Sequence, residues 1–105
     1  MTYIFFDGHV FSVKGHAGYA KKGQDIVCSS LSSYCNAFLM LAELLKKQGE
    51  IAEYRVTFKE ADIEVLIEGA SDFAKKIFSG IYGLMEALAQ QFPSFVTREE
   101  TGDRG

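Results

Sequence analysis

The chain of 105 residues lacks several features that identify whole classes of protein. It has no tryptophan and one proline, and its apolar runs stay below the roughly 18–20 residues that cross a membrane. The first residues show no basic region followed by an apolar stretch, so we expect no secretory signal there. Lys and Arg number 11 against 14 Asp and Glu. This balance favours neither nucleic acid nor a membrane as a direct partner.

Cysteine is also scarce, and its two copies do not form a disulfide framework. Cys28 and Cys35 lie seven residues apart in one expected helix, about 10 Å along its axis. This exceeds the separation that a disulfide bridges, so we expect two thiols in a reducing cytoplasm. With His9 and His16 they lack the close cysteine pair of a zinc knuckle. We therefore expect no metal and no cofactor.

The hydrophobic pattern is that of one globular domain with a modest core. Strict alternation predicts strands, and apolar residues three or four apart predict helices. The expected elements are strands over 2–6 and 9–14, a helix over 25–48, strands over 53–59 and 62–68, a helix starting at Ser71 or Asp72 and ending near 91, and a short strand over 94–97. The order ββαββα(β) predicts a two-layer α+β fold, an antiparallel sheet of four to five strands with two helices. Residues 1–97 would form this domain and residues 98–105 a polar tail.

Both expected helices have features that packing against a single sheet does not explain. The apolar arc of the first helix is wider than a sheet-facing helix needs. Gly80 and Gly83 weaken the second helix by up to about 1 kcal/mol each, which suggests close approach to another backbone. Two-fold dimers bring identical patches together, so these features predict a homodimer.

The segment GHAGYAKKGQDIVCSSLS, residues 15–32, is the unusual part of the sequence. It places His16 on a glycine-rich loop and Cys28 in the expected first turn of a helix that Asp25 would cap. A helix N-terminus favours the thiolate, a nearby histidine can accept the proton, and free amides can bind an oxyanion. A helical cysteine is more often a core residue, so the residues alone leave catalysis and packing both open.

This segment resembles the signature of the Prp family, the ribosomal-processing cysteine proteases. The likeness extends over nearly the whole chain, including Ile-Tyr-Gly-Leu and Gln-Gln-Phe-Pro-Ser-Phe-Val near its end. Departures are mild: residues 29–31 read Ser-Ser-Leu where Ala-Ala-Val is commoner, and Phe92 replaces a common Tyr. The matching residues are Gly15, His16, Ala17, Gly23, Asp25, Ile26, Val27, Cys28 and Ser32.

The resemblance implies a cysteine endopeptidase with Cys28 as nucleophile and His16 as general base. Asp25 would either orient His16 or only cap the helix. Ser32 would be either a polar wall of the site or a solvent-facing serine. The loop that closes on substrate would include Gly15, Ala17, Gly18 and Gly23.

The resemblance also implies a substrate, the N-terminal extension of large-subunit ribosomal protein number twenty-seven in Firmicutes and related bacteria. It implies that the extension is cut after an aromatic pair and that the enzyme is a homodimer. One alternative is a non-catalytic peptide-binding or ribosome-assembly module, which would hold the extension without cutting it. A small-molecule-binding dimer on a ferredoxin-like scaffold has little support, because no phosphate loop or dinucleotide fingerprint is present.

Overall fold

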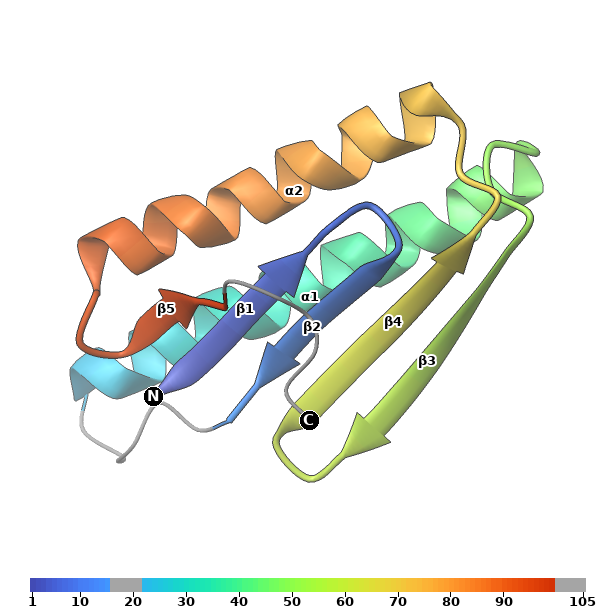
Figure 1. Ribbon diagram of the computed structural model, residues 1–105. Helices are drawn as coiled ribbons and strands as arrows, with labels where there is room; N and C mark the ends of the chain where they lie inside the picture. The colour runs from blue at the N-terminus through green and yellow to red at the C-terminus, as the bar shows by residue number, and fades with distance from the viewer. Residues whose placement is uncertain (16–21, 100–105) are drawn as a thin grey trace.

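The structure is a computed structural model that describes residues 1–15 and 22–99, with only the backbone of residues 22–25. It confirms the predicted α+β fold (Figure 1). The elements in chain order are β1 (Thr2–Phe6), β2 (Val10–Lys14), α1 (Lys22–Lys47), β3 (Glu53–Lys59), β4 (Asp62–Glu68), α2 (Asp72–Gln91) and β5 (Val96–Arg98).

The five strands form one sheet in the order β3-β4-β2-β1-β5, with both helices on one of its faces (Figure 1). Neighbouring strands pair antiparallel except at one edge, where β5 runs parallel to β1 with Thr2 opposite Val96. The sheet is therefore mixed rather than wholly antiparallel. The parallel pair arises because α2 returns the chain to the β1 edge before β5 begins.

Turn and cap residues fix where the elements start. The Asp7 carboxylate accepts hydrogen bonds from the backbone N–H groups of His9 (2.9 Å) and Val10 (2.8 Å), which shape the first hairpin. Desolvation alone would raise the pKa of Asp7, but these hydrogen bonds outweigh it and lower that pKa. At α2 the Ser71 hydroxyl accepts from the Ala74 N–H at 3.0 Å and donates to the Glu50 carboxylate. Ser71, rather than Asp72, is therefore the N-cap.

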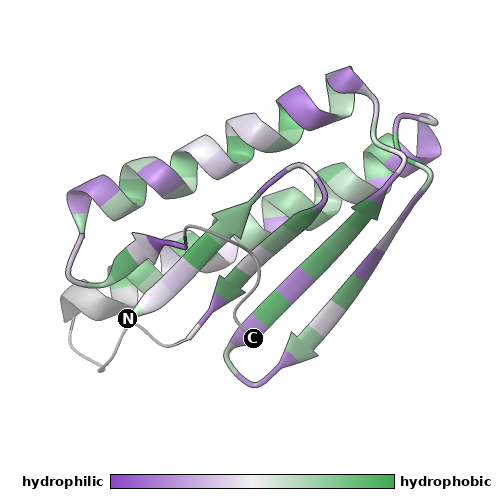
Figure 2. Ribbon diagram, viewed as in Figure 1, coloured by the Kyte–Doolittle hydropathy of each residue, from purple (hydrophilic) through white to green (hydrophobic). Residues whose placement is uncertain are grey.

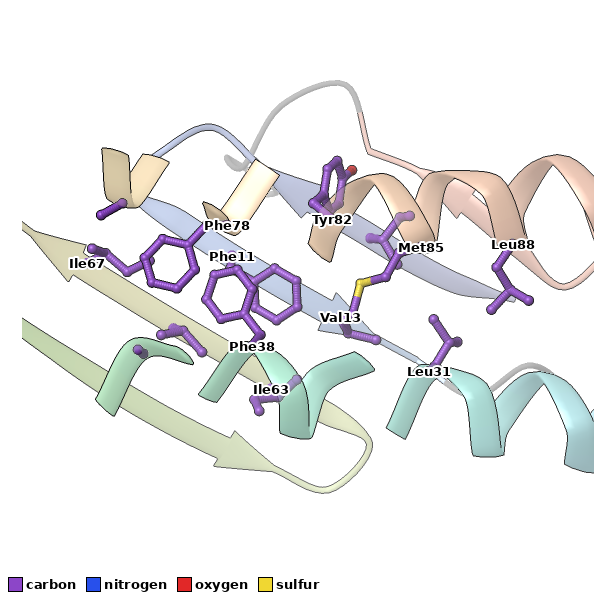
Figure 3. Close-up of a cluster of buried hydrophobic side chains, with 14 of the residues drawn as sticks. Phe11, Val13, Leu31, Phe38, Ile63, Ile67, Phe78, Tyr82, Met85 and Leu88 are labelled. Atoms are coloured by element: carbon purple, nitrogen blue, oxygen red, sulfur yellow. The ribbon is translucent and has the colours of Figure 1, made fainter. Parts of the chain in front are cut away.

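The core lies between the sheet and the helices and is built around aromatic rings (Figure 3). The Phe38 ring of α1 stacks on Phe11 of β2 at 3.9 Å between centroids and on Phe78 of α2 at 4.5 Å. All three side chains have no exposed surface. Phe38 thus joins both helices to the sheet. Figure 2 shows the matching pattern, with hydrophobic residues frequent on the central strands and polar residues recurring along the outer strands and helices.

Helix α1 differs from the predicted helix in two respects. It begins at Lys22, three residues before Asp25. Two properties of residues 22–24 allow this earlier start. Lys22 and Gln24 are residue types that favour helix. Gly23 lies in the first turn, where backbone N–H groups have no partner within the helix, so it weakens no internal hydrogen bond. Contrary to our expectation, α1 from Ile26 to Lys47 is long and apolar enough to cross a membrane. One such helix is weak evidence for a membrane span, because helices that pack into a protein core can meet the same criterion. In this fold α1 buries Phe38 and its neighbours on the inner face in the core.

Candidate active site

An open groove of about 460 Å³ runs between one flank of α1, the end of β2 and the turn from β3 to β4. Its apolar lining includes Leu31 and Leu39 of α1, Phe58 of β3 and Ile63 of β4. The Phe58 ring is 70% exposed, so it forms a lip rather than part of the core. The groove is open to solvent along the surface rather than an enclosed cavity.

Cys28 lines this groove and is exposed. Ser32 and Asn36 follow it along the same wall, because residues four apart lie on one helix face. Ser32 is exposed and lines the groove, so its position is compatible both with a polar wall of the site and with a solvent-facing serine. The wall therefore presents a thiol, a hydroxyl and an amide in sequence along the space that a peptide would occupy.

The predicted position of Cys28 in the first helical turn is wrong. Because α1 starts at Lys22, Asp25 is its fourth residue and Cys28 its seventh. The backbone of Asp25 is helical, so Asp25 is not the N-cap residue. The field of a helix N-terminus falls off within the first turn, so its effect at Cys28 is weaker than the sequence analysis assumed.

Cys35 is half-buried against the core at the inner side of the groove. Burial raises the pKa of the Cys35 thiol to about 11. A thiol with this pKa remains protonated at neutral pH and is a poor nucleophile. The two cysteines are therefore chemically distinct, and the exposed one is the candidate for reaction.

Gly15, at the end of β2, is fixed on the opposite side of the groove from α1. Its N–H donates to the Asp62 carboxylate at 3.0 Å, and its carbonyl accepts a long hydrogen bond from the Thr2 hydroxyl at 3.4 Å. Its φ is +93°, a region that favours glycine, and a Cβ there would lie 2.7 Å from the Met1 carbonyl oxygen. The predicted base, His16, is the next residue in the chain.

The other predicted site residues are only partly described. His16, Ala17 and Gly18 lie outside the described residues, and Gly23 and Asp25 are placed by their backbone alone, in the first turn of α1. Of the predicted set, the structure brings Gly15, Cys28 and Ser32 together on one groove.

Most of the groove residues were not predicted as site residues, and three of them, Asn36, Phe58 and Asp62, bear on its chemistry. Asn36 could have been found from its spacing, since Cys28, Ser32 and Asn36 recur every four residues in one helix. Asp62 and Phe58 gave no comparable signal, because they come from the second hairpin and reach the groove only through the fold.

Comparison with known proteins extends this picture. The family profile described as cysteine protease Prp matches residues 6–97. No curated protein matches the chain. Among solved structures, the S. aureus ribosomal processing protease Prp with a covalently linked product peptide has a TM-score of 0.72 and 13% identity, covering 94% of this chain and 98% of that one.

Two further structures share the fold. The S. aureus Prp with a substrate peptide has a TM-score of 0.69 and 11% identity over 93% of this chain and 95% of that one. SMU.848 from Streptococcus mutans has a TM-score of 0.62 and 20% identity over 87% and 81%. At these identities the solved structures establish the shared fold, and the profile match over most of the chain establishes the family. The chain therefore belongs to the Prp family of cysteine proteases.

Proposed function

We propose that this protein cuts peptides with Cys28 as its nucleophile and His16 as its general base. The observation that carries the proposal is the exposed Cys28 thiol on the wall of an open groove that is also lined by Gly15, the residue before His16. Cys35, the other thiol, is held protonated by burial, which raises its pKa to about 11. Of the two thiols, Cys28 is the one that is exposed on the groove.

The chemistry proceeds in two steps. His16 accepts the proton of Cys28, and the thiolate attacks the carbonyl carbon of the scissile peptide bond. The resulting tetrahedral intermediate collapses to a thioester as the amine leaves with the proton from His16. Water, deprotonated by His16, then attacks the thioester and releases the acid and the thiol. In this scheme Ser32 is a polar wall of the site, and Asp25 orients His16.

We further propose that the substrate is the N-terminal extension of large-subunit ribosomal protein number twenty-seven, cut after an aromatic pair. The support is indirect: S. aureus Prp, which shares the fold, is described as a ribosomal processing protease and has been solved with a substrate peptide. The apolar part of the groove, with Phe58 at its lip, suits large apolar side chains. We place this reaction in the cytoplasm, where the thiols stay reduced.

The test is cleavage of a peptide that carries the aromatic pair, followed by mass spectrometry of the products. Cys28→Ala should lower the rate by several orders of magnitude, as nucleophile deletions do elsewhere. His16→Ala should also cripple turnover. Cys35→Ala removes the other thiol of α1 as a matched comparison, and should keep most of the activity at some cost in stability. Undiminished cleavage by purified Cys28→Ala protein would refute the assignment.

We also propose a homodimer that forms through the outer face of the helix layer. Met40 and Leu44 of α1 and Phe73 and Leu84 of α2 are 47–73% exposed, a high value for such large apolar side chains. Among the described residues, nothing lies within 4 Å of a Cβ built at Gly80. This glycine therefore does not serve close packing within the chain and leaves room for a partner. Sedimentation that shows only a single-chain species at micromolar concentration would contradict the dimer.

A further inference from the structure

We propose that Asp62 is a positioning residue for the reaction, which holds Gly15 and through it the histidine that follows. This inference rests on the proposed function, because it assigns Asp62 a role toward His16. It concerns a residue of the second hairpin that no motif of the sequence marks. Asp62 has no proposed contact with the scissile bond.

The first observation is the hydrogen bond between two distant parts of the chain. The Gly15 N–H donates to Asp62 Oδ1 at 3.0 Å, across 47 residues of sequence and in a partly buried setting. The pairing of β2 with β4 ends at Val13 opposite Ile63. The Asp62 side chain therefore continues the attachment of β2 two residues past the last backbone pair, where the chain leaves the sheet.

The second observation is the place of Asp62 in the second hairpin. It is the first residue of β4 and pairs with Lys59 across a two-residue turn, so it stands at the end of the hairpin that lies beside the end of β2. The role of its side chain visible in the structure is to accept the Gly15 N–H.

The third observation is that Gly15 has little freedom. Its positive φ and the 2.7 Å approach of a built Cβ to the Met1 carbonyl oxygen exclude larger residues. The Thr2 hydroxyl, in a side chain that is 3% exposed, lies 3.4 Å from the Gly15 carbonyl oxygen. Both backbone polar groups of Gly15 are thus engaged, and the Cα of His16 follows only about 3.8 Å away through one peptide unit.

These observations predict an effect of Asp62 on kcat, because kcat depends on the relative positions of the reacting groups. Gly15, Asp62 and Cys28 line the same groove, so the hydrogen bond from Gly15 to Asp62 fixes the last described residue before His16 on the groove that holds the thiol. A displacement of about 1 Å between reacting groups can cost about a hundredfold in rate. Loss of the Asp62 anchor should therefore lower kcat, whereas any acceptor in the same place should preserve it.

The experiment compares Asp62→Ala with Asp62→Asn, whose amide oxygen can still accept the Gly15 N–H. We expect Asp62→Ala to lower kcat about ten- to a hundredfold, and Asp62→Asn to restore it to within about threefold of the wild type. Glu64→Ala is the matched control. It removes a neighbouring β2–β4 contact, the 3.8 Å pair between Glu64, two residues after Asp62, and Lys14, and should leave activity unchanged. If Asp62→Ala does not fold, Asp62→Ser takes its place in the comparison. The serine hydroxyl oxygen lies one bond closer to the backbone than a carboxylate oxygen, so it should not reach the Gly15 N–H.

The decisive measurement places Asp62→Ala in a His16→Ala background. A residue that acts only through His16 has no further effect once His16 is gone, so the double variant should cleave at the rate of His16→Ala alone. The rate of Cys28 alkylation at neutral pH should show the same non-additivity. A merely structural role would lower the rate by the same factor in both backgrounds and would overturn the inference.

Failure of the inference is distinguishable from failure of the proposed function. If Cys28→Ala and His16→Ala cut the peptide at the wild-type rate, the proposed function is wrong and the role of Asp62 falls with it. If both lose cleavage while Asp62→Ala retains it, or while Asp62→Asn does not rescue it, only the positioning role is wrong.

Discussion

The two thiols of α1 should differ sharply in reactivity toward iodoacetamide. Burial raises the pKa of Cys35 to about 11, so at pH 8 only about 0.1% of this thiol is ionised. An exposed cysteine with an ordinary pKa near 8.5 is ionised on the order of a hundredfold more at that pH. Only the thiolate reacts, but a thiolate of higher pKa is also intrinsically more nucleophilic, which recovers roughly tenfold. Cys35 in the folded protein should therefore react at least about tenfold more slowly than in the unfolded chain.

The assay is a time course of alkylation at pH 8, with peptide mapping by mass spectrometry to assign each modification. Cys28, which is exposed, should be modified first and Cys35 only slowly. The same reaction in guanidinium chloride gives the reference rates, because unfolding exposes both thiols. Cys28→Ala protein isolates the Cys35 rate in the native state. Native Cys35 that reacts as fast as Cys28, or as fast as in denaturant, would refute the account of its burial.

Two further predictions concern stability. Phe38→Ala removes a fully buried ring that stacks on both Phe11 and Phe78. The substitution should lower the free energy of unfolding, measured by urea titration, by about 3–5 kcal/mol. A loss below about 1 kcal/mol would contradict the central place of Phe38 in the core. Burial raises the pKa of Cys35 to about 11 and of Tyr82 to about 12. Unfolded thiols and phenols lose their protons near pH 8.5 and 10, so the folded state holds more protons in this range and stability should fall as pH rises above about 8. Tyr82→Phe should reduce that fall at pH 10–12, and an unchanged pH profile would argue against the effect.

Local sequence determined most of the elements. The strands Thr2–Phe6, Glu53–Lys59 and Asp62–Glu68 have the predicted bounds. For the last two the signal is the alternation of apolar and polar residues that is typical of half-buried strands. The second helix follows its predicted cap and ends before Pro93. These features depend on residues a few positions apart, whose interactions do not require the rest of the fold.

The sequence is compatible with more than one start for α1. Asp25 is a favoured cap, but Lys22–Gln24 are also compatible with helix, and the structure extends the helix over them. The family resemblance nominated Cys28 independently of that start, and the structure gives it the exposed place on the groove. The sequence thus nominated the chemical group, while its position in the helix came from the structure.

Tertiary structure alone decided what surrounds the thiol. The parallel pairing of β5 with β1 and the order of the five strands join segments far apart in the chain, and local patterns do not encode such pairings. The same holds for Asp62, whose hydrogen bond to Gly15 spans 47 residues. The sequence by itself determined the helices, the strands and the candidate nucleophile. Only the packing of the second hairpin beside α1 placed Phe58 and Asp62 on the groove, because the distance between side chains from different elements is set by the whole fold.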